Sequence, residues 1–214
     1  MIYRLTKRLA FPDPREGEPD GLFAVGGDLS VDRLLLAYSN GIFPWYSFRD
    51  SDILWFCPMR RFVIFPDEIH VSHSMRTLMN KGLYRVSINR DFPSVIRNCG
   101  DLRKEQEGAW LGDDMTKAYT ALHEQGFAAS VEVWDQDDKL VGGLYGVTLG
   151  RCFFGESMFS LVPSASKMAL IFLADTMAEN GGVMIDCQLE TPHLKSMGGR
   201  YISYDEYMEL VRME

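Results

Sequence analysis

Residues 181–188 read GGVMIDCQ, and this stretch decides how the chain is expected to fold. The two glycines end a helical pattern, and an apolar strand from Val183 to Gln188 follows them. Side chains two positions apart on a strand share a face, so Asp186 and Gln188 are expected side by side at the strand end. A buried polar group without a partner costs about 1 to 3 kcal/mol. The pair therefore either meets solvent or belongs to a functional site.

The segments before this strand predict an α+β domain. An antiparallel meander is expected at residues 129–134, 140–149 and 152–159, followed by a helix capped by Ser164 whose apolar residues recur three and four positions apart. By analogy, this order of strands, helix and strand is that of an acetyltransferase-like (GNAT-like) domain. Acyl-CoA enzymes of that architecture carry a glycine-rich pyrophosphate loop where this chain reads FSLVPSASK (159–167), and the chain has no GxxxxGK[ST] loop. No cofactor is therefore expected.

Two domains are predicted, a small loop-rich N-terminal domain at residues 1–62 and the acetyltransferase-like domain at residues 63–214. The first is rich in Pro, Gly and aromatic residues, with one helix at residues 30–40. Ahead of the meander the pattern predicts five more elements: a strand at 62–65, a helix at 72–80, a strand at 84–89, and helices at 92–99 and 113–125.

The composition is that of a globular protein of 214 residues, with 46% hydrophobic and 24% charged residues. The first residues, MIYRLTKRLAFPDP, lack the apolar run of a signal peptide, and the longest apolar segment, residues 168–174, is too short to span a bilayer. A cytoplasmic location is expected. The four cysteines form no CxxC pair and are expected to be reduced, and no metal site is expected, because the close pair His70 and His73 lacks partners at ligand spacing.

The charge is distributed unevenly along the chain. The formal net charge is −8, yet residues 76–104 hold seven basic residues and only two acidic ones. Such segregation predicts either a surface for a polyanion or a solvated basic face without a partner. The basic residues are Arg76, Lys81, Arg85, Arg90, Arg97, Arg103 and Lys104.

Glu156 and Met158 form a second unusual pair, because their spacing puts an acid and a flexible hydrophobe on one face of a strand. A core strand would favour two hydrophobic residues there. Glu156 is predicted to hold a cationic group of a substrate, while Met158 lines a pocket. The alternative is an exposed strand end.

Seven motifs stand in a characteristic order and spacing along the chain. They are GLFAVGGDLS (21–30), GIFPWYS (41–47), EVW (132–134), LVGGLYGV (140–147), GESMFS (155–160), ASK (165–167) and IDCQ (185–188). Together they resemble the bacterial leucyl/phenylalanyl-tRNA–protein transferases over nearly the whole chain. That family transfers Leu, Phe or Met from aminoacyl-tRNA to proteins with an N-terminal Arg or Lys and so marks them for degradation. The resemblance implies these partners and an acetyltransferase-like C-terminal domain behind a small N-terminal one.

The resemblance also implies roles for individual residues. Asp186, Gln188 and Glu156 would be catalytic, either with an Asp-assisted Gln188 drawing the amine proton or with these residues mainly positioning the substrates. Trp45 and Trp110 would stack on the terminal adenosine. The wall of the amino-acid pocket would be Leu144, Met158, Leu173, Met177 and Ile185, although strict alternation turns Ile185 away from Asp186.

The tRNA backbone would then lie along the basic residues, with Arg76, Lys81, Arg85, Arg90 and Arg97 as phosphate contacts. Two other classes compete with this interpretation. An acyl-CoA N-acyltransferase would explain the fold and the acids but needs the absent glycine loop. A non-enzymatic RNA-binding module would explain the tryptophans and the basic residues but would leave Glu156, Asp186 and Gln188 without a role.

Overall fold

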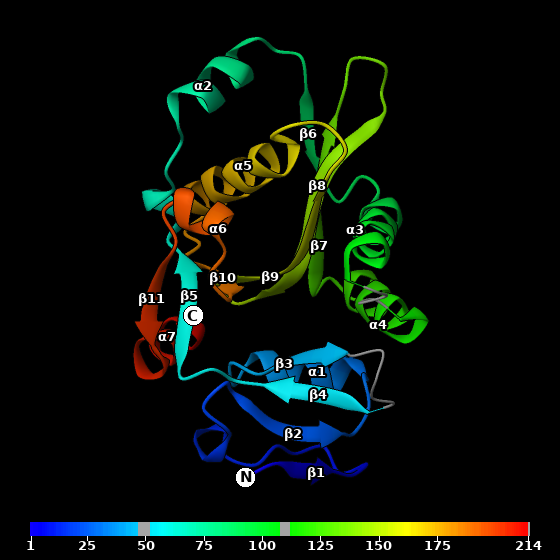
Figure 1. Ribbon diagram of the computed structural model, residues 1–214, viewed down its shortest axis with the longest axis vertical. Coiled ribbons are helices and arrows are strands. Elements are labelled where there is room, and N and C mark those ends of the chain that lie inside the picture. Colours follow the sequence, from blue (N-terminus) through cyan, green and yellow to red (C-terminus); the bar gives the residue numbers. More distant parts are fainter. Residues whose placement is uncertain (47–51, 108–111, 214) are drawn as a thin grey trace.

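The computed structural model describes residues 1–46, 52–107 and 112–213, with the backbone alone for residues 46 and 103–107. Its strands form two sheets, of which the smaller lies at one end of the molecule (Figure 1). This sheet has the order β1-β2-β4-β3. Its strands are β1 (Tyr3–Leu5), β2 (Leu22–Gly26), β3 (Phe43–Tyr46) and β4 (Ile53–Phe56).

The N-terminal part is thus more regular than the expected loop-rich domain. Its strands are only three to five residues long and are separated by Pro and Gly, so their period-2 pattern is short. Helix α1 (Val31–Tyr38) begins as predicted, with the Ser30 hydroxyl accepting a hydrogen bond from the Arg33 amide. The next strand starts at Arg60 and belongs to the other sheet. A domain boundary at residue 62 stays a prediction.

The larger sheet has seven strands in the order β11-β5-β10-β9-β8-β7-β6. Strands β7, β8 and β9 form the predicted antiparallel meander, and β10 then pairs parallel to β9 after the intervening helix. The predicted order of an acetyltransferase-like domain is therefore confirmed. The strands are β5 (Arg60–Ile64), β6 (Arg85–Ile88), β7 (Ala128–Trp134), β8 (Leu140–Leu149), β9 (Cys152–Ser160), β10 (Met184–Gln188) and β11 (Arg200–Ser203).

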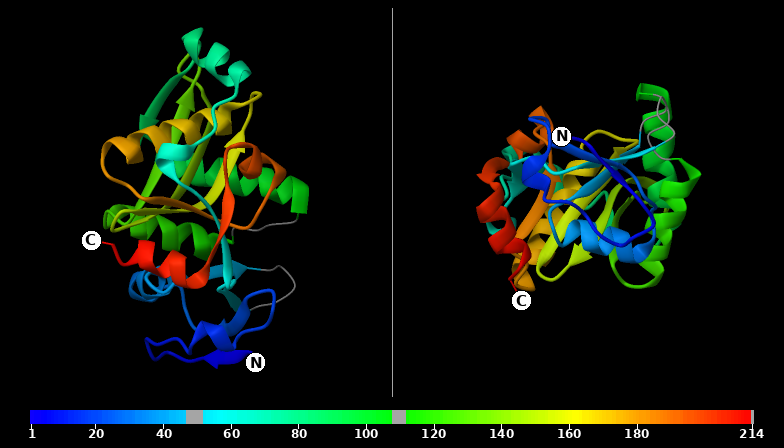
Figure 2. Two further views of the ribbon diagram at one scale, coloured as in Figure 1. Left: turned by 90° about the vertical axis from the view of Figure 1, so that its left-hand side faces the viewer. Right: turned by 90° about the horizontal axis from the view of Figure 1, so that it is seen from below.

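Helices cover both faces of this sheet (Figures 1 and 2). Helices α2, α5 and α6 pack with one hydrophobic cluster, whereas α3, α4 and α7 pack with another that also includes the N-terminal elements. The segment after Gln188, for which no element was predicted, supplies α6, β11 and α7. The helices are α2 (His73–Asn80), α3 (Phe92–Glu107), α4 (Asp113–Glu124), α5 (Ala165–Glu179), α6 (Pro192–Ser196) and α7 (Tyr204–Val211), with 3₁₀ turns at Pro14–Glu16 and Pro66–Glu68.

Two expectations about helix ends are wrong. Helix α3 continues past Gly100 to Glu107, because the chain after the glycine is rich in helix-forming residues. Ser164 precedes α5 with a left-handed φ of 70° and makes no side-chain cap; instead the Ser160 hydroxyl accepts a hydrogen bond from the Ser166 amide. All four cysteines are free, as expected. No helix in the described part of the chain has the length and hydropathy that a membrane crossing needs.

Strands β9 and β10 each contain an irregularity. In β9, Gly155 pairs with Gly146 and Ser157 pairs with Tyr145, so Glu156 is an extra residue. In β10, Asp186 pairs with Val63 and Gln188 with Phe62, so Cys187 is extra. Such bulges bend a strand and re-aim its side chains, and they concentrate next to active sites.

Replacing Gly146 by alanine is expected to destabilise this region. A Cβ atom at Gly146 would lie 2.2 Å from the Phe154 carbonyl oxygen, and backbone cannot yield as a flexible side chain can. We expect a loss of about 2 to 3 kcal/mol in unfolding free energy, the upper part of the range for overpacking. Urea unfolding measures it, with Thr148→Ala on the same strand as a control that adds no atoms. Equal stability of Gly146→Ala and the wild type would contradict the packing described here.

Candidate active site

A cavity of about 550 Å³ lies where β10 leaves β9. The two strands pair from Met184 to Asp186, where the ladder ends at Phe154, and the chain then turns through the bulge at Cys187. Side chains of β8, β9, β10, α5 and α6 line the cavity, joined by Trp45 from the N-terminal sheet. The residues that matter below are Trp45, Leu144, Glu156, Ser157, Met158, Leu170, Leu173, Ile185, Gln188 and His193.

Glu156 is the acid of this cavity. Its Oε1 lies 2.6 Å from the Tyr38 hydroxyl of α1, and its Oε2 lies 2.8 Å from the Tyr119 hydroxyl of α4. The two phenol oxygens are themselves 2.5 Å apart, and both tyrosines are buried. Burial raises the pKa of the Glu156 carboxyl to about 7, and the hydrogen bonds from the tyrosines and from Gln188 only partly oppose that rise.

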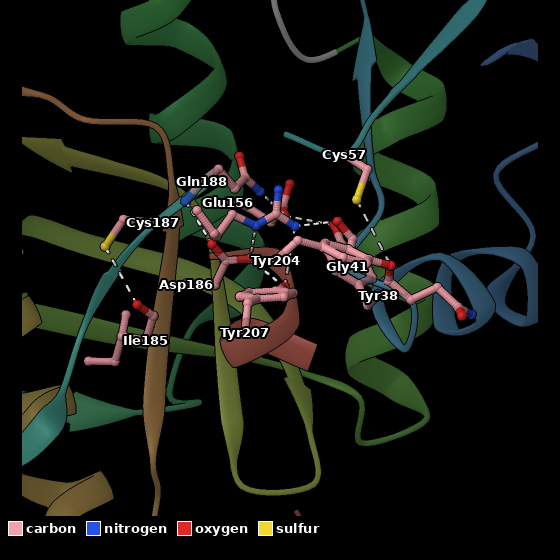
Figure 3. A network of polar contacts seen from close by, with 12 residues as sticks. Tyr38, Gly41, Cys57, Glu156, Ile185, Asp186, Cys187, Gln188, Tyr204 and Tyr207 are labelled. Carbon is pink, nitrogen blue, oxygen red and sulfur yellow. Dashed lines mark hydrogen bonds and ion pairs between the residues drawn. The ribbon is translucent and has the colours of Figure 1, made fainter. Parts of the chain in front are cut away.

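Gln188 stands beside Glu156 (Figure 3). Its backbone has a left-handed φ of 63°, which non-glycine residues rarely adopt and which functional sites often contain. Its amide nitrogen Nε2 donates to Glu156 Oε1 at 3.1 Å, and its backbone N–H donates to Asp186 Oδ1 at 2.8 Å. The predicted proximity of Asp186 and Gln188 is thus confirmed, although a bulge produces it rather than plain alternation.

Asp186 lies behind Gln188, with only 1% of its surface exposed. Its Oδ2 accepts a hydrogen bond from the Tyr207 hydroxyl at 2.8 Å and lies 3.2 Å from Arg61 Nε (Figure 3). Burial raises the pKa of this carboxyl, and the Arg61 guanidinium and these hydrogen bonds oppose the rise. The Asp186 side chain is therefore a buried group that holds its neighbours, while Glu156 and Gln188 present polar groups at the cavity.

Arg61 connects the two sheets. Its guanidinium lies between the rings of Phe43 and Tyr207, 4.8 and 4.7 Å from their centroids, and it donates to the Gly41 carbonyl oxygen. Burial lowers the pKa of Arg61, but the Asp186 carboxylate, Tyr207 and Cys57 together raise it more, so the guanidinium stays charged. One side chain thus ties β3 of the N-terminal sheet, α7 and the end of β10 together.

Comparisons with known proteins decide the family. The model of the leucyl/phenylalanyl-tRNA protein transferase family matches residues 63–212, and that of its N-terminal domain matches residues 27–59. The chain belongs to this family. A leucyl/phenylalanyl-tRNA–protein transferase from Flavobacterium psychrophilum is 49% identical over 99% of the chain and all of that protein, and one from Syntrophus aciditrophicus is 51% identical over 99% of the chain and 88% of that protein.

The predicted family and enzyme class are therefore confirmed, and the chain is a transferase of this family. Among solved structures, L-PGS from Bacillus licheniformis is 12% identical, covers 79% of this chain and 54% of its own, and has a TM-score of 0.46. A likeness at that TM-score adds nothing to the topology described above.

The transferase cavity contains most of the predicted wall. Leu144, Met158, Leu173 and Ile185 line it, and Ile185 does so from the face of β10 opposite to the Asp186 side chain. Met177 is not among the lining residues, because it lies one helical turn beyond Leu173 on α5, where it packs against Gly182. Its expected place in the pocket wall stays a prediction.

The structure describes only some of the aromatic and basic residues that were expected to contact tRNA. Trp45 lines the cavity of the transferase, whereas Trp110 lies outside the described residues, as do the side chains of Arg103 and Lys104. The five predicted phosphate contacts are all exposed, on α2, β6, α3 and the turns beside them. Two of them, Arg85 and Arg90, share Asp138 as an ion-pair partner.

Sequence reasoning missed several polar residues of the transferase site. Arg61 stands in the strand RRFVI, where a charge between apolar residues was the available signal. Tyr38 and Tyr119 sit among apolar helix residues and look like ordinary core. The Ser157 hydroxyl and His193 Nε2 line the cavity and are buried without a hydrogen-bond partner in the described part of the chain. In the same part, no cluster of three His, Cys, Asp or Glu side chains suits a metal ion.

Removing Arg61 is expected to destabilise the protein strongly. Arg61→Met leaves the Asp186 carboxylate buried without its cation, which costs about 3 to 5 kcal/mol. Adding Asp186→Asn should recover part of this loss, because no charge is then left unpaired. Urea unfolding measures all three proteins. The matched control is Arg85→Met, whose ion pair with Asp138 is exposed and should change stability by about 1 kcal/mol or less. A loss no larger than that of the control would contradict the role of Arg61.

Proposed function

We propose that the chain transfers Leu, Phe or Met from aminoacyl-tRNA to the α-amino group of proteins that begin with Arg or Lys. The observation that carries this proposal is one cavity with apolar walls and a polar end formed by Glu156 and Gln188. Charged tRNA is a cytoplasmic substrate, so we place the reaction in the cytoplasm. The product carries a new apolar N-terminus, which would mark it for degradation.

The walls of the cavity suit an apolar amino-acid side chain. The wall is an aliphatic surface formed by Leu144, Leu170, Leu173, Ile185 and Met158. Met158 can adapt to either a branched or an aromatic side chain. A difference of about one methylene in fit is worth only about 1 to 3 kcal/mol, so such a wall accepts related amino acids. Leu170, one turn before Leu173 on α5, adds to this wall.

The chemistry needs no energy-supplying cofactor, because the aminoacyl ester is already activated. The α-amino nitrogen attacks the ester carbonyl carbon, the C–N bond forms, and the bond to the ribose 3′ oxygen breaks. An α-amino group has a pKa of about 7.7 to 8.0 and is mostly protonated at neutral pH, so it must first lose a proton. Gln188 is placed to orient the amine or the carbonyl, and Asp186 fixes Gln188 through its backbone N–H.

Trp45 and the basic residues would hold the tRNA. An indole at the cavity edge can stack on the terminal adenine, a contact worth about 1 to 3 kcal/mol and tolerant of sequence. Arg76, Lys81, Arg85, Arg90 and Arg97 would contact phosphates, which position the acceptor end without reading bases. The Ser157 hydroxyl and His193 Nε2 are free to bind polar groups of the aminoacyl-adenosine or of the peptide.

Transfer of labelled leucine from leucyl-tRNA to a peptide with N-terminal Arg tests the proposal directly. We expect label in that peptide and none in its N-acetylated form, because the acetylated nitrogen cannot attack. Gln188→Ala should lower the rate of transfer at least tenfold, about 1.4 kcal/mol in activation free energy, while tRNA affinity changes less. The measurements are single-turnover transfer and tRNA binding.

Two further arms separate the competing classes. Acetyl-CoA replaces leucyl-tRNA in one arm, and product there would favour an acyl-CoA transferase. Binding of tRNA without transfer to any peptide would favour an RNA-binding module. Label in both peptides, or in neither, would contradict the proposed reaction.

The salt dependence of tRNA binding tests the basic residues. Arg97→Ala should weaken binding of leucyl-tRNA and of other aminoacyl-tRNAs about equally, because phosphates are the same in all of them. The slope of log K against log salt concentration should become shallower by about 1. Arg60→Ala is the control, because Arg60 is exposed but lies over Tyr201 at the far edge of the sheet. An unchanged slope for Arg97→Ala would remove that residue from the tRNA surface.

A further inference from the structure

Three short oxygen contacts close a ring around the Glu156 carboxyl group. Glu156 Oε1 lies 2.6 Å from the Tyr38 oxygen, the Tyr38 oxygen lies 2.5 Å from the Tyr119 oxygen, and the Tyr119 oxygen lies 2.8 Å from Glu156 Oε2. All three distances are within the range of O–H···O hydrogen bonds. Both tyrosines are buried, with at most 1% of their surfaces exposed, so water does not take over these contacts.

Three hydrogen bonds between oxygens require three hydrogens. Each tyrosine supplies one, and an ionised carboxylate supplies none. With Glu156 ionised, both phenols would donate to the carboxylate, and their oxygens would face each other at 2.5 Å with no hydrogen between them. A protonated carboxyl group supplies the third hydrogen, and every contact of the ring is then a hydrogen bond.

Gln188 determines in which direction the hydrogen bonds run around the ring. Its Nε2 donates to Glu156 Oε1, which makes Oε1 the carbonyl oxygen and Oε2 the hydroxyl oxygen. The Glu156 hydroxyl then donates to Tyr119, Tyr119 donates to Tyr38, and Tyr38 donates back to Oε1. Each donor has one acceptor, and the carbonyl oxygen accepts from two groups, as its two lone pairs allow.

We propose that Glu156 rests as the neutral acid, closed into a ring of three hydrogen bonds with Tyr38 and Tyr119, and that it acts in the proposed transfer as a proton donor. It is not the anionic anchor for a basic substrate that the sequence suggested. Tyr38 and Tyr119 are positioning residues that act through Glu156. The proton-donor role rests on the proposed function, whereas the protonation state does not.

The groups around Glu156 favour the neutral form. Tyr38 faces it from α1, Tyr119 from α4, and Gln188 and Asp186 from β10; Tyr145 of β8 packs edge-on against Tyr119. None of these is a cation. The nearby Asp186 carboxylate disfavours a second negative charge on Glu156. Arg61 does not offset this effect, because it is already paired with Asp186.

The reaction balances with a neutral Glu156. When the free amine attacks the ester carbonyl carbon, the C–N bond forms and the C–O bond to the ribose breaks. The leaving 3′ oxygen takes the proton of Glu156 Oε2, and the amine nitrogen gives up one proton, which restores the acid. No proton, oxidant or reductant is consumed over the cycle.

The pH dependence of stability tests the protonation state without any substrate. The folded-state pKa of about 7 lies above the ordinary 4.5, so the native protein holds a proton that the unfolded chain releases. Glu156 therefore stabilises the fold fully below pH 4.5, and this contribution is lost as the pH rises to about 7. The unfolding constant of wild type relative to Glu156→Gln should rise up to about tenfold per pH unit in that window. A flat ratio overturns the proposal.

Infrared spectroscopy gives a second readout that does not depend on how stable the variant is. Wild type at about pH 5.5 should show the C=O stretch of a protonated carboxyl group, which Glu156→Gln lacks and which fades as the pH rises through about 7. Tyr38→Phe removes a donor to Oε1 and should move this band to higher frequency. The matched control, Tyr201→Phe on β11, should leave it in place. Absence of the band, or a band unmoved by Tyr38→Phe, overturns the ring.

The pH profile of transfer tests the proton donor. At saturating peptide, the single-turnover rate constant of the wild type should fall above about pH 7, as Glu156 loses its proton, and Glu156→Gln should be slower and lack this falling limb. A falling limb that persists in Glu156→Gln contradicts proton donation. If no transfer occurs at any pH, the proposed function fails, while the stability and infrared results still decide the state of Glu156.

Discussion

The buried pair of Arg61 and Asp186 is the interaction on which the site depends. Taking two charges out of water is costly, and apolar residues of similar volume often stabilise a core as well as an ion pair does. Apolar residues could not supply hydrogen bonds that fix the orientation of neighbouring groups. The Asp186 carboxylate also accepts from Tyr207 and from the Gln188 backbone, so the pair fixes α7, the N-terminal sheet and the end of β10 against one another. Stability is one consequence of this pair, and placement of Gln188 is the other.

The bulges in β9 and β10 bring the polar side chains of the site together on this support. A regular strand presents alternate residues to opposite faces of the sheet. Without the bulges, the register of β9 and β10 alone would decide which face Glu156 and Gln188 occupy. The extra residue in each strand breaks that rule at the point where the strands diverge. The glutamate and the amide thereby meet at 3.1 Å, while Ile185 and Met158 keep their places in the apolar wall. The polar end and part of the apolar wall of the cavity thus come from the same two strands.

Some of these features could be predicted from the sequence and others could not. The meander, α5 and β10 were predictable because each has a long periodic pattern or a clear Gly stop. Leu144 and Leu173 came instead from the resemblance to the family, and Met158 came from its spacing to Glu156. Bulges have no such signal, since one extra residue leaves the apolar pattern nearly unchanged. The ring around Glu156 joins α1, α4 and β9, which are far apart in the chain, and nothing local to Tyr38 or Tyr119 shows that they meet.

Two acids of one site are thereby given different environments. Asp186 faces a permanent cation and two hydrogen-bond donors, and it carries the charge that Arg61 balances. The hydrogen-bond partners of Glu156 within the described residues include no cation, and its tyrosine partners can accept as well as donate. Neighbouring carboxyl groups whose surroundings push their pKa values apart can take separate acid and base roles. In the proposed transfer, a neutral Glu156 would also leave the polar end of the cavity without excess negative charge. A basic N-terminal residue would then not be held there as a tight ion pair, and its amine would be free to lose the proton that attack on the ester requires.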